Sequence, residues 1–325
     1  MGMRLDVDRY RDRAAPVDLA GIDFDAFRDR PLPAGAIRCL RYMHDIEHHT
    51  VCYLRDLLVT PAHRDPDITT FLTVWSYEEM WHGLALGRVL AAHGEAHGAG
   101  RITELRRRLG VRDRLSPMLH ALGSTLAGDT FPAVHMAWGA VNEWTTQAGY
   151  ARLIDRARHP VLTDLLSRIM RQEGRHIAFY AAEAERRLSN SRRAQRLCRA
   201  ALRRLWRPVG AGVMPRSEVA FMVRELFGDH GGRAIAQRID RRVDGLPGLD
   251  GLRLVERAVD HYTACNTAAP RPAPAVRPAF PALAASQRAA RASAPCFPLL
   301  ALRAGPLGPG AAPTGAASRP TQPAA

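Results

Sequence analysis

Two copies of the motif Glu-x-x-His, each within a strongly helical stretch, constrain this chain more than any other feature. The first is Glu79-x-x-His82 and the second is Glu173-x-x-His176. Residues three positions apart on a helix lie one above the other on the same face. A carboxylate and an imidazole placed in this way can bind one metal ion together. The sequence therefore predicts two helices that each carry a pair of metal ligands.

Each motif is preceded by a further glutamate at about the distance that a helical hairpin spans. Glu47 lies 32 residues before Glu79, and Glu143 lies 30 residues before Glu173. Two antiparallel helices joined by a short loop bring residues at this spacing level with each other. The gap of 64 residues between Glu79 and Glu143 suits a long crossover between the two hairpins.

This arrangement is typical of carboxylate-bridged di-iron bundles, in which two helices supply Glu-x-x-His and two others supply one glutamate each. Hard oxygen donors with one histidine per metal suit iron or manganese, whereas zinc has no redox chemistry. We therefore expect two Fe ions and an O₂-activating oxidoreductase. The predicted metal ligands are Glu47, Glu79, His82, Glu143, Glu173 and His176.

Apolar periodicity and helix breakers predict an all-α protein. Residues 1–34 contain three prolines and are expected to be irregular, while residues 35–265 are expected to form the helical domain. The predicted fold is a ferritin-like four-helix bundle with a long crossover and extra C-terminal helices. The crossover is expected to contain a short helix at about 102–109 and a connection through Pro117. The other expected helices are at about 35–58, 67–93, 132–158, 160–188, 190–206, 215–228, 231–244 and 250–264.

Composition separates the end of the chain from the rest. Residues 266–325 are rich in Ala and Pro and contain no Asp or Glu, so we expect a disordered tail. The five cysteines form no C-x-x-C pair, which favours a reducing compartment. With no signal-peptide pattern and no apolar run of membrane-spanning length, the expected location is cytoplasmic, without membrane contact.

A formal net charge of +14 comes from arginine alone, because the chain has no lysine. Part of this charge is concentrated in residues 186–207, RRLSNSRRAQRLCRAALRRLWR. The segment is either a solvated helical face or a docking surface for an acidic protein. Nucleic-acid binding is disfavoured, because no DNA- or RNA-binding motif accompanies it.

The residues around both motifs resemble the signatures of the soluble acyl-acyl-carrier-protein desaturases. Residues 77–83, YEEMWHG, look like that family's EENRHG, and residues 172–176, QEGRH, resemble its DEKRH. The chain departs from the family at three positions. Trp81 replaces an Arg, Gln172 replaces an Asp, and Gly174 replaces a Lys.

Two further positions extend the resemblance. Glu47 is followed by Tyr53, and Glu143 is followed one turn later by Thr146, where the family has a threonine beside its oxygen-binding face. The resemblance implies a homodimer that receives electrons from a ferredoxin-type donor and desaturates a fatty acyl chain on acyl carrier protein. It also implies a catalytic role for Thr146, the alternative being a helix-packing hydroxyl. Other possible functions are an N-oxygenase, a hydroxylase, and a non-catalytic iron-binding protein or ferroxidase.

Several residues near the motifs have simpler interpretations. Glu78 lies about 100° around the helix from Glu79, so we do not assign it to the metal. Glu183 and Glu185 are expected to pair with nearby arginines at the surface. The histidines around Glu47 are His44, His48 and His49. We expect them at the surface, although one of them could support a metal ligand. The tryptophans expected in the core are Trp75, Trp138 and Trp144.

Overall fold

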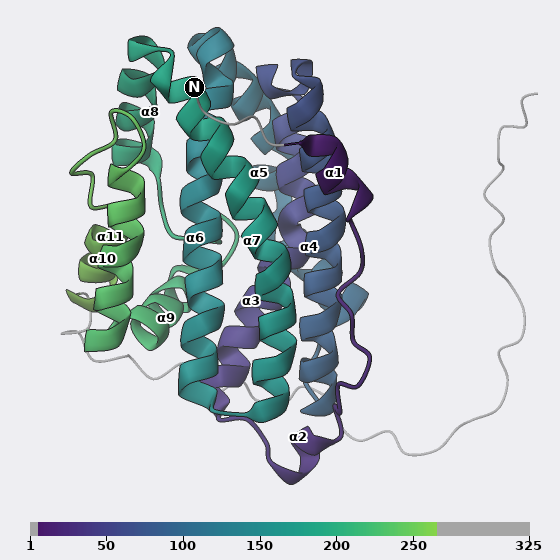
Figure 1. The fold of residues 1–325 in the computed structure, drawn as a ribbon. Helices are drawn as coiled ribbons and strands as arrows, with labels where there is room; N and C mark the ends of the chain where they lie inside the picture. Colours follow the sequence, from purple (N-terminus) through teal and green to yellow (C-terminus); the bar gives the residue numbers. More distant parts are fainter. Residues whose placement is uncertain (1–5, 265–325) are drawn as a thin grey trace, which may run out of the picture. The chain divides into compact units, whose positions relative to one another are not determined.

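The computed structural model describes residues 6–264, and within this range the protein is helical and contains no strand (Figure 1). The expected all-α class is therefore confirmed. The predicted tail lies outside the described residues. None of the helices within residues 6–264 is long and apolar enough to cross a membrane. The helices are α1 Val7–Asp12, α2 Ala26–Asp29, α3 Ala34–Leu58, α4 Pro66–Ala92, α5 Gly98–Ala127, α6 Phe131–Ala157, α7 Pro160–Ser189, α8 Arg192–Leu205, α9 Arg216–Phe227, α10 His230–Asp244 and α11 Leu254–Ala264.

Four long helices run side by side and hold the predicted ligands. α3 packs along α4, α6 packs along α7, and the two pairs meet through contacts of α4 with α7 and of α3 with α6 (Figure 1). The apolar side chains of all four helices join one core. Because each helix brings one face to this core, the ligands on those faces are carried into its centre.

Local signals explain where the paired helices begin. Asp65 caps α4 by accepting hydrogen bonds from the backbone N–H groups of Asp67 and Ile68, and a proline follows it at the first helical position. The turn between α6 and α7 is only two residues long. Arg158 adopts a left-handed backbone there (φ 47°), and His159 caps α7. Such a short turn makes α6 and α7 antiparallel neighbours.

The crossover between the two pairs differs from the prediction. A helix does break near residue 109, at Gly110 (φ 54°), but it then continues to Ala127 with Pro117 inside it. The predicted connection through Pro117 is therefore wrong. A proline cannot donate a hydrogen bond to the carbonyl four residues earlier. Here Arg55 of α3 donates instead to that carbonyl, Asp113 O, at 3.1 Å, so the proline is tolerated.

The first 34 residues also differ from the expectation, because they contain the short helices α1 and α2. α1 packs on α4. At the other end, α8 packs on α6 and α7, α9 to α11 pack on one another, and α9 and α10 also pack on α6. The bounds of α8 to α11 agree with the predicted C-terminal helices to within four residues.

Candidate metal centre

The six predicted ligands lie together in the middle of the four long helices. They form two overlapping groups, and within each group the potential ligand atoms lie within 4.8 Å of one another. Every one of these side chains is at most 6% exposed. Residues from four helices, up to 129 positions apart in the chain, are thus gathered at one buried point. The first group is Glu47, Glu79, His82 and Glu173, and the second is Glu79, Glu143, Glu173 and His176.

Glu79 and Glu173 belong to both groups because each faces both imidazoles. Glu79 Oε2 lies 3.3 Å from His82 Nδ1, and its Oε1 lies 3.2 Å from His176 Nδ1. Glu173 Oε1 lies 3.3 Å from His82 Nδ1, and its Oε2 lies 3.0 Å from His176 Nδ1. Each carboxylate therefore offers one oxygen to each half of the site, which is the position of a bridging ligand.

The other two glutamates each belong to one half and are held by a hydrogen bond from the opposite helix pair. Trp75 Nε1 of α4 donates to Glu143 Oε1 at 2.9 Å, and Glu143 Oε2 faces His176 Nδ1 at 4.0 Å. The hydroxyl of Tyr150 in α6 donates to Glu47 Oε1 in α3. Trp75 is in the core, as the sequence predicted, but its role as a donor to Glu143 was missed.

Both imidazoles turn Nδ1 toward the carboxylates and Nε2 toward the residue that directly precedes the other motif. His176 Nε2 lies 2.9 Å from Glu78 Oε2, and His82 Nε2 lies 2.9 Å from Gln172 Oε1. Such partners fix the tautomer and the ring orientation of metal-binding histidines. Glu78 lies outside both ligand groups, as expected, but the sequence did not indicate that it supports His176. Arg175 also pairs with Glu78.

The N-terminal segment, predicted to be irregular, covers the residues that hydrogen-bond to the two imidazoles. Tyr10 of α1 donates to Glu78 Oε2 at 3.1 Å, and the Gln172 amide donates to the carbonyl of Ala15 at 3.0 Å. Tyr10 itself is only 9% exposed. The one sequence signal for this contact was weak: Val7 and Tyr10 lie three residues apart behind a helix-capping Asp6.

Burial and mutual repulsion divide the four carboxylates into two classes. Burial raises the pKa of Glu47 and of Glu143 well above the ordinary value, and the neighbouring carboxylates add to this effect. Burial acts in the same direction on Glu79 and Glu173. At Glu79 it is outweighed by a hydrogen bond from Glu47 and by the two imidazoles. At Glu173 it is outweighed by the charge of His82 and by hydrogen bonds from both imidazoles. The pKa of each bridging carboxylate is therefore held below its ordinary value. A cation placed between these groups would remove the repulsion that protonation otherwise relieves.

The donor set fits a pair of metal ions. Glu173 Oε1 is buried and lies 3.3 Å from His82 Nδ1, but it makes no well-oriented hydrogen bond to a described residue, which is costly for a carboxylate oxygen. Four carboxylates and two neutral imidazoles balance the charge of two divalent ions. These buried Glu and His groups could thus hold metal. A pair of ions between them would offset the repulsion among the four carboxylates and would use the Nδ1 atoms that both rings turn toward those carboxylates.

An apolar cavity reaches the centre beside Glu47. It lies between α3 and α6 on one side and α9, α11 and the segment Trp206, Pro208 and Val209 on the other, and has a volume of about 80 Å³. Thr146 and Thr145 line the same cavity. The Thr145 hydroxyl donates to the carbonyl of Val141 at 2.7 Å, whereas the Thr146 hydroxyl makes no hydrogen bond to a described residue.

Some of the simpler interpretations need correction. His44 and His49 are buried rather than at the surface, and His48 is half-buried. Glu183 pairs with Arg186 and Arg187, as expected, but it is buried, whereas Glu185 is exposed. Trp144 is buried and Trp138 packs against the core, as expected.

Comparisons of the chain with protein-family models, with curated proteins and with solved structures find no match.

Proposed function

We propose that this protein is a ferritin-like di-iron oxidoreductase that uses O₂ to oxidise a long apolar substrate, most simply by desaturating a fatty acyl chain. The observation that carries the proposal is the pair of overlapping ligand groups that share Glu79 and Glu173. Carboxylates in this shared position can bridge two ions. The resemblance of both Glu-x-x-His motifs to the acyl-acyl-carrier-protein desaturases supports the same conclusion.

Iron accounts for the donor set better than zinc does. Oxygen donors outnumber nitrogen donors two to one, and every ligand is buried. Two adjacent iron ions, when bound, supply the paired electron transfers that reductive activation of O₂ requires. The surrounding core excludes water, so that an oxidising species formed there meets substrate rather than solvent.

The lining of the cavity beside Glu47 supports an apolar substrate, and at about 80 Å³ the cavity must widen to admit a long chain. Its walls are almost entirely apolar, and they include Met43, Val223 and Phe227. Such walls bind hydrocarbon by excluding water and offer few polar groups for other substrates. We assign to Thr146 Oγ1 the role of proton donor at the end of the cavity that Glu47 lines, since this hydroxyl has no other hydrogen-bond partner among the described residues.

A basic helix supports acyl carrier protein as the carrier. α8 exposes a series of arginines whose side chains form no ion pair within residues 6–264, and it is followed directly by Trp206, which lines the cavity. An acidic carrier protein on this helix would bring its acyl chain to the cavity wall. The exposed arginines of α8 are Arg192, Arg193, Arg196, Arg203 and Arg204.

Homodimerisation is part of the proposal, and an exposed apolar stripe supports it. Along the second half of α5, five side chains recur at three- and four-residue steps and are each 46–80% exposed. Soluble monomers rarely expose a continuous apolar face of this kind. The electron donor is proposed from the resemblance alone as a ferredoxin-type protein. The stripe consists of Leu115, Met118, Leu119, Leu122 and Leu126.

The test compares metal content with turnover in three variants. Glu79→Ala removes a shared ligand and is expected to lower bound iron from about two ions per chain to less than one. Thr146→Val keeps the shape of the side chain and should retain both ions. It should nevertheless slow acyl oxidation by roughly 10²–10⁴, because a general acid is lost. Thr145→Val is the matched control, since the Thr145 hydroxyl is already bonded to the backbone.

Turnover is measured by mass spectrometry of acyl chains on acyl carrier protein, with O₂ and reduced ferredoxin supplied. Full iron occupancy in Glu79→Ala would refute the site. Parental turnover in Thr146→Val would leave Thr146 as a packing residue. Iron oxidation without any acyl product in the parent protein would instead favour a ferroxidase.

A further inference from the structure

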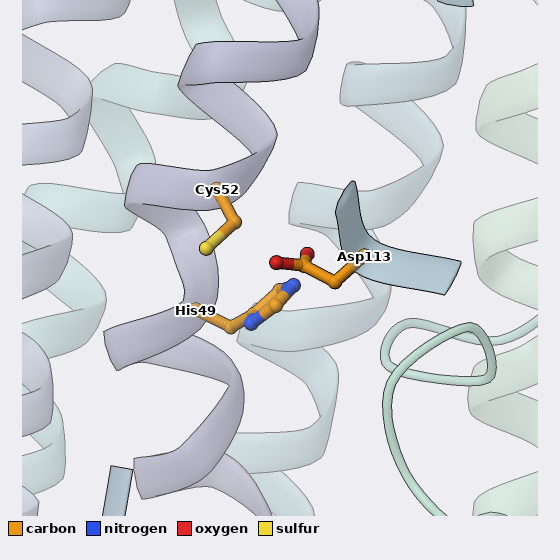
Figure 2. A group of neighbouring side chains, drawn as sticks. All are labelled: His49, Cys52 and Asp113. Carbon is orange, nitrogen blue, oxygen red and sulfur yellow. The ribbon is translucent and has the colours of Figure 1, made fainter. Parts of the chain in front are cut away.

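A second group of potential ligands lies outside the paired centre, between α3 and α5. His49, Cys52 and Asp113 bring a ring nitrogen, a thiol and a carboxylate oxygen within 4.8 Å of one another. His49 and Cys52 are three residues apart on α3 and so share a face. Asp113 comes from α5, three residues after the break at Gly110. Figure 2 shows the three side chains converging on one small space between the helices.

His49 provides the independent sign of a missing partner. His49 is 4% exposed, and neither of its ring nitrogens makes a hydrogen bond to a described residue, although Nδ1 is itself buried. The imidazole is directed toward Cys52 and Asp113 (Figure 2). A buried polar ring without a full set of partners is costly, and a bound ion that orders the ring would offset this cost.

The surroundings prepare Asp113 as a ligand. Arg55 Nη1 donates to Asp113 Oδ2 at 3.2 Å, and Arg55 Nη2 donates to Oδ1 at 3.1 Å. These bonds hold the pKa of Asp113 below its ordinary value, so the carboxylate is charged at neutral pH. Each carboxylate oxygen has a second lone pair, and carboxylates that bind metals are commonly oriented by such outer partners.

The charges around the group balance before an ion binds. Arg55 pairs with both Asp113 and Asp56. Arg106 also acts on all three potential ligands, so two cations face two acids. The charge of a divalent ion must therefore be offset in part by Cys52 as a thiolate. Burial raises the pKa of the Cys52 thiol. Binding must therefore displace its proton, so that a thiol and a divalent ion give a metal–thiolate bond and one released H⁺.

We propose that His49, Cys52 and Asp113 form a binding site for a single zinc ion, with a water molecule as the fourth ligand. One nitrogen, one sulfur and one oxygen donor suit a borderline-soft tetrahedral ion, whereas the oxygen-rich paired centre suits iron. The ion would join α3 to the second half of α5, which follows the break at Gly110. The exposed apolar stripe lies on this same half of α5.

Cobalt titration tests the site, because a thiolate ligand gives Co²⁺ a charge-transfer band in the near ultraviolet. The protein used is the full chain carrying Glu79→Gln and Glu173→Gln, which removes the shared ligands of the paired centre. This background is expected to bind one Co²⁺ per chain with the thiolate band, and Zn²⁺ should displace it. Adding Cys52→Ser should abolish the band and weaken binding at least tenfold.

Two further variants complete the design. Cys198 is a fully buried thiol in α8, outside the proposed site. Its substitution, Cys198→Ser, should leave the band and the Co²⁺ affinity unchanged. Asp113→Asn should weaken Co²⁺ binding about tenfold or more while keeping the thiolate band at saturation. Absence of the band in the background protein, or its survival after Cys52→Ser, would overturn the proposal. The paired centre is judged separately, because Cys52→Ser in the otherwise unchanged chain should still bind two iron ions.

Discussion

Trp75→Phe tests whether the hydrogen bonds around the centre, and not only its six ligands, determine metal affinity. Trp75 Nε1 donates to Glu143 Oε1 at 2.9 Å, and both residues are less than 9% exposed. Phenylalanine retains an aromatic ring in the same space but removes the donor. Glu143 Oε1 then becomes a buried carboxylate oxygen without that partner.

Two independent arguments give the size of the effect. A hydrogen bond to a charged group contributes about 1.5–3 kcal/mol. Loss of an outer partner of a ligand typically costs 10–100-fold in metal affinity, which is about 1.4–2.8 kcal/mol. We therefore expect Trp75→Phe to weaken binding by one to two orders of magnitude in the half of the site that contains Glu143 and His176, with little change in the other half.

Trp81→Phe is a matched control on the same helix. Its indole Nε1 is buried but makes no hydrogen bond to a described residue, so this substitution removes similar volume without removing a bond. Metal affinity is measured by anaerobic competition with a coloured chelator. In Trp75→Phe one of the two ions should be lost at lower chelator concentration, whereas Trp81→Phe should behave like the parent. Equal metal affinities for the two variants would refute the reasoning.

Two further predictions concern stability. Burial acts to lower the pKa of both His82 and His176. Glu173 and Glu79 nevertheless raise the pKa of His82 to about 9. Tyr10 together with the surrounding glutamates raises the pKa of His176 well above its ordinary value. The folded apoprotein thus keeps protons between pH 6.5 and 9 that the unfolded chain releases, and its free energy of unfolding should fall across this range by up to roughly 3 kcal/mol for His82 alone. Thermal unfolding after chelation checks this, and a melting temperature that rises with pH would contradict it. Gly139→Ala should destabilise the protein by about 1–3 kcal/mol, because the new Cβ would lie 2.2 Å from the Tyr180 ring. At Gly174 an added Cβ would have its nearest neighbouring atom 4.0 Å away, so Gly174→Ala should be neutral or stabilising by up to about 1 kcal/mol. Denaturant titration of both variants measures the difference.

The ligand set could be predicted from sequence because it depends on local rules. Helical periodicity brings Glu79 level with His82 and Glu173 level with His176, whatever packs around them. Hairpin length then brings Glu47 and Glu143 to the same height as the motifs. The helix ends followed for the same reason, since breakers and capping residues act within a few positions of themselves.

The partners of the ligands could not be predicted in this way, because they come from distant parts of the chain. Glu78 points away from Glu79 on its own helix, yet in the bundle that direction faces α7 and His176, 98 residues later. Tyr10 reaches the same layer from a segment whose composition predicted no regular structure. Only the packing of α1, α4 and α7 decides these contacts.

At Pro117 a local sequence rule gave the wrong prediction, because a tertiary contact decides the structure there. A proline in a helix is locally unfavourable, and the sequence accordingly predicted a connection there. The structure continues the helix because Arg55, 58 residues earlier, supplies a hydrogen bond to the carbonyl of Asp113. Motif spacing and helix periodicity thus predicted that the six candidate ligands lie together, since both act along one chain segment. The residues that orient and enclose those ligands became apparent only when the helices met, because a hydrogen bond depends on distance in space and not on separation in sequence.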